Sequence, residues 1–398
     1  MGEVELSAPV LRPLPYHREV VAYLKEHEPE IWDWSISLEA RELQAEELRT
    51  ALLRETYRLS PDSHPKAHEA AMRVAERLGI TAPVTLYQAG GPSMNAGLTY
   101  LPEEIHVVLH GPVLERLDST ELVALLGHEI AHYRLWSEEA GDILTADRIL
   151  RQTVADPRAS ASHGETARLF QLHTELYADR GAALAGADPG PAISTLVKIQ
   201  TGIDSADPAA YLRQAEELET ADSSASKARS HPEIFLRAQA VDKWWRGDAG
   251  LDDWLRRRLR GPLAVQRLDL VGQLEATRLT RRLVGDFLRR SEFTSEAHSN
   301  QAKTYFPDWA GTGNADDKVD AAMVAEIDPA TRQFLAAVIL DLALCDEEVR
   351  EEGMMEAGRY AQSLELVEPL LETLRRDVRL SKREIDALNR RLRKEAQV

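Results

Sequence analysis

Two histidines four residues apart constrain the fold of this chain more than any other feature. They belong to a five-residue run, His128-Glu129-Ile130-Ala131-His132. Apolar residues before this run recur at helical spacing, so we predict a helix that begins at Ser119 and continues through His132. At that spacing both imidazoles lie on one face of the helix, about one turn apart, as two ligands of a tetrahedral zinc ion require. We therefore expect the fold to be organised around a metal-binding helix.

Glu129 directly follows the first of these histidines, where its carboxylate can reach a water molecule at the metal. A carboxylate in this position can take a proton from the attacking water and later deliver it to the leaving amine of a peptide. We therefore predict that Glu129 is a general base and then a general acid. The alternative interpretation is a solvated helix face that carries two histidines and a glutamate without chemistry.

A catalytic zinc ion needs a third protein ligand and one open position. The best candidate is Glu175, on a second predicted helix, with Asp179 four residues later on the same face. Asp179 is suited to accept a hydrogen bond from the free ring nitrogen of a ligating histidine. His173 is a competing ligand, but it faces a different direction on that helix. We predict one Zn²⁺ per chain, held by His128, His132 and Glu175.

This combination of motifs resembles the HtpX and CAAX prenyl protease family of gluzincin zinc metallopeptidases. In that family, HExxH is followed by a helix that carries Glu-x-x-x-Asp, and the glutamate is the third zinc ligand. Glu175 and Asp179 match that pattern. Members of the family named above carry membrane helices, and this chain has no run of 18 apolar residues, so it resembles soluble members of the group better.

Two flanking pieces extend the resemblance to residues 65–245. Asn95 and Ala96 resemble an Asn-Ala segment on the strand that borders the cleft, which implies substrate binding. His231, in a Ser-His-Pro sequence, and Arg237 resemble a His-Pro-…-Arg segment whose side chains help to stabilise the tetrahedral intermediate. From the residues alone, Asn95 fits a turn equally well, the Ser-His-Pro sequence fits a helix start, and Arg237 could pair with a surface carboxylate.

The predicted fold class is mainly α (α+β). Short strand candidates at 84–87, 97–100 and 105–109 form a small β-sheet packed on the HExxH helix. We predict an N-terminal helical segment at 1–60, the metallopeptidase domain at 61–250, a helical connector with a linker at 251–317, and a helical C-terminal domain at 318–398. The linker is the polar stretch 291–317. The C-terminal domain distantly resembles TerB-like helical domains in its acidic stretch around 342–352.

The formal net charge of −18 disfavours nucleic acid as a partner, because a phosphate backbone would be repelled. One basic run, 256–260, is predicted to be the solvated face of a helix. The N-terminal sequence lacks the features of a signal peptide. We therefore expect a cytoplasmic protein without a membrane span.

These predictions together indicate a soluble zinc metalloendopeptidase that acts on a peptide or protein substrate. The alternative is a latent enzyme or a non-catalytic, zinc-stabilised adaptor that acts through its C-terminal domain. That domain could recruit a protein partner or regulate the peptidase.

Overall fold

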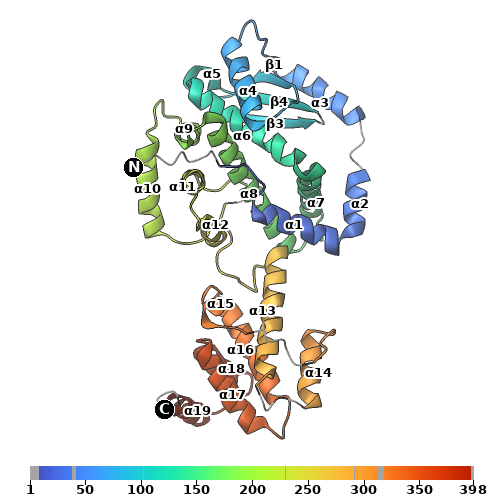
Figure 1. Cartoon of the computed structure of the whole chain (residues 1–398), viewed down its shortest axis with the longest axis vertical. Coiled ribbons are helices and arrows are strands. Elements are labelled where there is room, and N and C mark those ends of the chain that lie inside the picture. The colour runs from blue at the N-terminus through green and yellow to red at the C-terminus, as the bar shows by residue number, and fades with distance from the viewer. Residues whose placement is uncertain are drawn as a thin grey trace, which may run out of the picture. The chain divides into compact units, whose positions relative to one another are not determined.

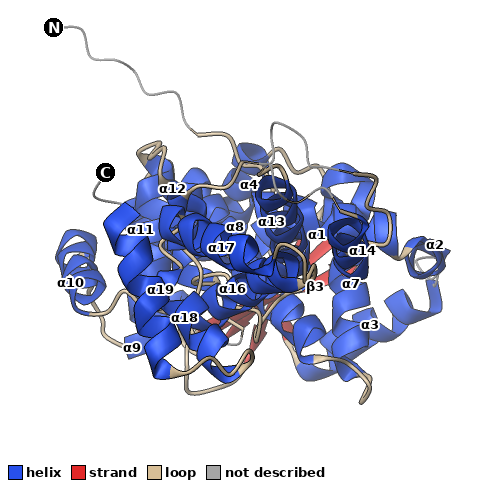
Figure 2. Cartoon of the chain, turned by 90° about the horizontal axis from the view of Figure 1, so that it is seen from below, coloured by secondary structure: helices blue, strands red, loops and turns tan. Residues whose placement is uncertain are grey.

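The computed structural model describes most of the chain, namely residues 9–37, 42–101, 103–228, 230–290, 293, 295–311 and 318–395. The N-terminal residues 1–8 and parts of the predicted linker lie outside these ranges. The chain folds into two compact units, Met1–Gly261 and Pro262–Val398. Helices prevail in both units, as Figures 1 and 2 show. The predicted mainly-α class is therefore confirmed. No described helix is long and apolar enough to cross a membrane.

The helices of the first unit are α1 (Pro15–His27), α2 (Pro29–Ser37), α3 (Glu42–Glu55), α4 (Pro65–Leu78), α5 (Val113–Arg116), α6 (Ser119–Ser137), the 3-10 helix η1 (Glu138–Gly141), α7 (Asp142–Ala155), α8 (Ala161–Gly186), α9 (Pro189–Thr201), α10 (Pro208–Ala221), α11 (Ile234–Trp245) and α12 (Leu251–Leu259). The first unit contains one small sheet, which lies at one end of the unit among α3–α6, away from α10–α12 (Figure 1).

The sheet has four strands in the order β1-β2-β4-β3. The strands are β1 (Tyr57–Arg58), β2 (Val84–Ala89), β3 (Asn95–Leu101) and β4 (Glu104–His110). β2 and β4 pair in parallel, and the other two pairings are antiparallel. Because β3 is the last strand in this order, one of its edges has no partner strand among the described residues. This edge is available to an extended peptide.

The sheet packs on the helix predicted from the two histidines. β3 and β4 both contact α6, and α4 covers β2. The alternate residues that face these helices are fully buried; they are Leu86, Ile105, Val107 and Leu109. Burial on this face follows from the period-two alternation of strand side chains. The prediction of a small sheet on the HExxH helix is confirmed.

The two ligand-bearing helices, α6 and α8, approach each other closely because small residues line their contact. A Cβ atom at Gly127 of α6 would lie 2.7 Å from the side chain of Ala185 on α8. On the opposite side of the contact, a Cβ at Gly181 would collide with Ala131. Larger residues here would push the helices apart and separate the side chains that each helix presents to the other.

A capping box fixes the start of α6. Asp118 accepts hydrogen bonds from the backbone N–H groups of Thr120 and Glu121, and Glu121 accepts one from the Asp118 N–H. The buried Glu121 carboxylate also accepts from Lys198 Nζ at 2.7 Å and from Ser194 Oγ at 2.7 Å, both on α9. The same carboxylate therefore caps α6 and holds α9 against it.

The basic run at 256–260 is only partly a solvated face, since Arg257 is exposed but two other arginines are buried. Arg258 is only 5% exposed and Arg260 8% exposed. The guanidinium of Arg258 donates to the carbonyl of Asp222 and lies over the ring of Phe235. The prediction of solvation was wrong for these two arginines; around Arg258, a backbone carbonyl and an aromatic ring replace water.

The second unit is a helical domain with its own apolar core. Its helices are α13 (Leu270–Leu288), α14 (Glu296–Tyr305), α15 (Ala321–Ala325), α16 (Pro329–Leu344), α17 (Arg350–Ser363), α18 (Val367–Arg376) and α19 (Lys382–Glu395). α14 lies inside the stretch predicted to be a linker or long loop. That prediction was wrong for this segment, because Ala302 and His298 of α14 are buried and anchor the helix.

Candidate metal centre

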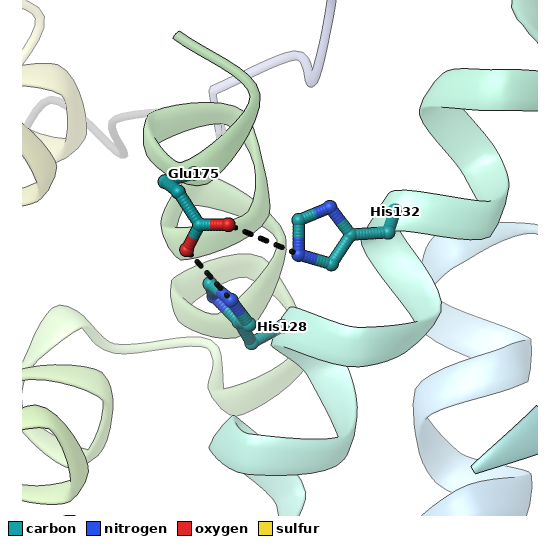
Figure 3. A group of neighbouring side chains, drawn as sticks. All are labelled: His128, His132 and Glu175. Carbon is teal, nitrogen blue, oxygen red and sulfur yellow. Dashed lines mark ion pairs between the residues drawn. The ribbon is translucent and has the colours of Figure 1, made fainter. Parts of the chain in front are cut away.

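The three predicted zinc ligands converge at the contact between α6 and α8, as Figure 3 shows. His128 Nε2 lies 3.5 Å from Glu175 Oε2, and His132 Nε2 lies 3.8 Å from Glu175 Oε1. All three residues are buried or nearly so. Among the described residues, no other group of three His, Cys, Asp or Glu side chains offers donors this close together.

The donor set fits zinc in type and in spacing. Two imidazole nitrogens and one carboxylate leave a fourth position open, as catalytic zinc sites do. With bonds of about 2.0–2.1 Å, neighbouring ligands of a tetrahedral ion lie about 3.4 Å apart, close to the separations found here. Glu175 Oε2 is buried and has no hydrogen-bond partner. A buried carboxylate oxygen without a partner is costly unless a cation completes its coordination.

Asp179 lies behind the ligands and connects two of the predicted site residues. Its Oδ1 is 3.1 Å from His128 Nδ1. Arg237 of α11 donates two hydrogen bonds to the same carboxylate, at 2.7 Å and 2.6 Å. Arg237 also lies 3.5 Å from Glu175 Oε2. The hydrogen bond between Asp179 and His128 Nδ1 orients the imidazole of His128. His132 Nδ1, in contrast, is buried and has no hydrogen-bond partner.

Opposite charges keep this cluster ionised despite its burial. Burial raises the pKa of Asp179, but Arg237 and His128 outweigh it and hold that pKa below its ordinary value. Burial also opposes the charge of Glu175, but His128, 3.5 Å away, and the charge of Arg237 outweigh burial and lower the pKa of Glu175 well below the usual range. Both carboxylates are therefore anionic and suited to bind or support a cation.

The two histidines differ in their metal-free state. Burial works against a charge on His128, but its hydrogen bond to Asp179 and the nearby carboxylate of Glu175 raise its pKa to about 10. Burial lowers the pKa of His132 to about 4. A metal ion that bound here would displace the proton of His128, since only the neutral ring nitrogen can ligate.

Glu129 points into the cleft beside the ligands and is 7% exposed. Burial raises the pKa of its carboxyl to about 7, although the positive charges of His128 and Arg237 act in the opposite direction. A carboxyl group with a pKa near neutrality can both accept and return a proton at physiological pH.

The ligands lie in a cavity of about 270 Å³. Asn95 and Ala96 line it at the start of the edge strand β3. One end is apolar and is formed by α6, α8 and α9, with the residues Ala124, Leu125, Ala182, Ala192, Leu196 and Ile199. The other end is more polar and contains Trp136, Arg151 and Gln171. The cleft therefore offers different surroundings on the two sides of the metal ligands.

His231 also lines the cavity, from the loop that precedes α11. Its Nε2 lies 3.6 Å from Glu175 Oε2, its Nδ1 is 2.9 Å from Ser230 Oγ, and its side chain is 60% exposed. Of the alternatives left open by the sequence, pairing of Arg237 with a surface carboxylate does not occur, because its partner is the buried Asp179. His173 is not in the cluster: its Nδ1 is 2.7 Å from the Leu169 carbonyl, and its ring stacks on Tyr16.

Sequence reasoning missed several residues of the cleft. Trp136 lies four residues after His132 on the same helical face, a spacing from which it could have been predicted. Arg151 and the α9 residues come from helices with no motif of their own. Only the tertiary fold brings them to the ligands.

Two sequence comparisons match part of the chain to metallopeptidases. Residues 61–245 match the sequence profile of Peptidase family M48. The chain is 31% identical over 197 residues to a protein of Arabidopsis thaliana named plastoglobule-localized metallopeptidase 48, chloroplastic. That match covers 45% of this chain and 56% of the relative, so the chain spans little more than half of the relative's length. No solved structure matches the chain. The TerB-like resemblance of the second unit stays a prediction.

Proposed function

We propose that this chain, whose residues 61–245 match the sequence profile of Peptidase family M48, is a zinc-dependent metalloendopeptidase. The observation that carries the proposal is the convergence of His128, His132 and Glu175 beside Glu129, in a cleft bordered by an unpaired strand edge. A zinc ion bound there would polarise the scissile carbonyl and activate water for attack.

The chain's own residues would perform the proton transfers. Glu129 removes the proton of the attacking water and returns it to the leaving amine. His231, above Glu175, donates a hydrogen bond to the developing oxyanion. Arg237 is already bonded to Asp179, so its positive charge supports the oxyanion and the carboxylates from behind the ligands.

The substrate would lie extended along β3, with its backbone hydrogen-bonded to the free edge near Asn95 and Ala96. The apolar end of the cleft then receives a side chain next to the scissile bond. Substrates with an apolar residue at that position fit this cleft best, because burial of such a side chain is favourable by about 25 cal/mol per Å².

A peptide-library cleavage assay tests the proposal directly. The purified chain is assayed before chelation, after chelation and after zinc is returned, and product ends are identified by mass spectrometry. We expect internal cleavage that chelation abolishes and zinc restores. Cleavage that persists without metal, or no cleavage of any peptide by zinc-loaded protein, would contradict the proposal.

A zinc-stabilised adaptor is not favoured, since such a site needs neither a general base nor an open cleft. Latency, a partner or autoregulation through the C-terminal unit, the cytoplasmic location, and the domain boundaries at 60, 250 and 317 stay predictions.

A further inference from the structure

The loop between α10 and α11 carries His231 and has no secondary structure of its own. The His231 side chain is largely exposed, and its ring is hydrogen-bonded to Ser230, its chain neighbour. Pro232, directly after it, is buried. Besides the buried Pro232 after it, the position of the imidazole beside Glu175 depends on how the backbone of residues 222–228 before it is held.

Arg168 of α8 holds that backbone. One guanidinium nitrogen, Nη1, donates to the carbonyl of Ala228 at 3.0 Å and to that of Ser226 at 3.5 Å. The other, Nη2, donates to the carbonyl of Leu259 at 3.1 Å. Glu165, one turn earlier, accepts two hydrogen bonds of 2.8 Å from the same side chain and fixes its orientation. Arg168 is only 14% exposed in its side chain, so water competes little for these bonds.

Helix α12 completes the support from the other side of the loop. The Ser226 N–H donates to the carbonyl of Arg258 at 2.7 Å. Arg258 Nη1 in turn donates to the carbonyl of Asp222 at 3.0 Å. Ser226 itself is 5% exposed. The loop is thus held between α8, which carries Glu175, and α12, which lies beyond the family match at 61–245.

We propose that Arg168 is a positioning residue that ties the 222–231 loop to α8 and α12 and thereby keeps His231 above Glu175. The inference rests on the proposed function, because His231 must act in the reaction for its position to affect turnover. Only a guanidinium, with five donors in a rigid plane, can reach three carbonyls and a carboxylate at once. It follows that α12 belongs to the catalytic unit.

A double-mutant cycle between Arg168→Ala and His231→Ala tests the proposal. Arg168→Ala should lower kcat by about tenfold with little change in KM and unchanged zinc content, because a misplaced group loses its catalytic advantage. In the His231→Ala background the same substitution should lower kcat by less than about twofold. An equal loss in both backgrounds, or no loss in the first, would overturn the proposal.

Arg158→Ala is the matched control, since this arginine is exposed and pairs with the neighbouring Asp156 away from the loop. It should leave kcat unchanged. Arg168→Lys replaces Arg168→Ala if the alanine variant does not fold, and it should not rescue turnover, because one ammonium cannot reach all three carbonyls.

Hydrogen exchange measured by mass spectrometry gives a readout without turnover. Peptides covering 222–231 should exchange faster in the Arg168 variant than in wild type, and peptides of α6 should not change. If hydrogen exchange in the loop were unchanged, Arg168 would not hold the loop and the proposal would be refuted. If wild type cleaves no peptide, the proposed function fails while this arm still decides whether Arg168 holds the loop.

Discussion

The two units of the chain each bury a carboxylate, and they satisfy it differently. In the second unit, Asp286 accepts hydrogen bonds from Tyr360 Oη at 2.9 Å, the Val319 N–H at 3.1 Å and Arg289 at 2.6 Å. In the first unit, Glu175 has one buried oxygen with no hydrogen-bond partner, surrounded by His128, His231 and Arg237 at 3.5–3.6 Å.

The difference separates a carboxylate that its own unit satisfies from one that is suited to bind a cation. The hydrogen bonds from three donors in the second unit satisfy Asp286, so no further group is needed to offset its desolvation. Glu175 faces donors at distances that suit a shared cation better than direct hydrogen bonds. A buried polar group that the fold leaves without a partner is therefore the most informative feature of this structure.

The largest expected effect is on chemistry in the first unit. Glu129→Gln should lower kcat by about 10²–10⁴-fold, because the amide cannot accept the proton of water. Zinc content should stay at the wild-type value, since Glu129 is not one of the three converging donors. Steady-state kinetics measures kcat, and elemental analysis measures the zinc content. A variant that retains wild-type kcat would contradict the role of Glu129 as general base.

The next effect concerns the support of the ligands. Asp179→Asn should weaken zinc binding by about 10–100-fold, because the amide holds His128 and Arg237 less strongly than the carboxylate. Asp286→Asn is the matched control and should leave zinc affinity unchanged. Competition with a chelating dye measures both constants. Equal affinities in wild type and the Asp179 variant would mean that this hydrogen bond does not support the site.

The hydrogen bonds of Asp286 should affect the stability of the second unit and not the peptidase activity. Tyr360→Phe removes one donor from the buried Asp286 and should lower the unfolding free energy of the second unit by about 1–3 kcal/mol. Peptidase activity at a temperature where the variant is folded should not change. Urea denaturation followed by hydrogen exchange of α13 and α17 measures the loss, and unaltered stability would show that Asp286 is satisfied without Tyr360.

The smallest effect is a pH dependence in the first unit. Burial, with the nearby His173 and Arg180, lowers the pKa of His17 well below 6.5, and its Nε2 bonds Thr174 Oγ1 at 3.2 Å. As pH falls, His17 is protonated in the unfolded chain before it is protonated in the folded chain. The contribution of neutral His17 to the free energy of unfolding is therefore present above about pH 6.5 and is lost as pH falls below it.

Comparing urea unfolding at pH 7.5 and 5.5 tests this sign. Between pH 7.5 and 5.5, the free energy of unfolding should fall by about 1 kcal/mol more in wild type than in His17→Gln, since one pKa unit corresponds to about 1.4 kcal/mol. His27→Gln, at the exposed end of the same helix, should behave as wild type does. Equal pH dependence in wild type and His17→Gln would exclude His17 as the titrating group.

Much of the site could be predicted because helical spacing alone places its residues. His128, His132 and the pair Glu175 and Asp179 each lie four residues apart, so their shared faces follow from the helix period. Fold class followed in the same way, from the alternation of apolar residues in the short strands that precede α6.

What could not be predicted depends on contacts between distant segments. Arg237 finds Asp179 58 residues away, and Arg168 binds backbone carbonyls, which have no sequence signature. Arg258 is buried although its neighbours in sequence are charged. The apolar end of the cleft comes from α9, whose sequence shows only ordinary helical periodicity.

Zinc content by elemental analysis, on wild type and on Glu175→Ala, tests the central claim most directly. Both proteins are purified with zinc supplied and then dialysed. The account predicts one zinc per wild-type chain, with most of it lost from the variant along with peptide cleavage. A wild-type protein without zinc, or a Glu175→Ala protein that holds as much zinc as wild type, would contradict the claim that Glu175 completes a metal site.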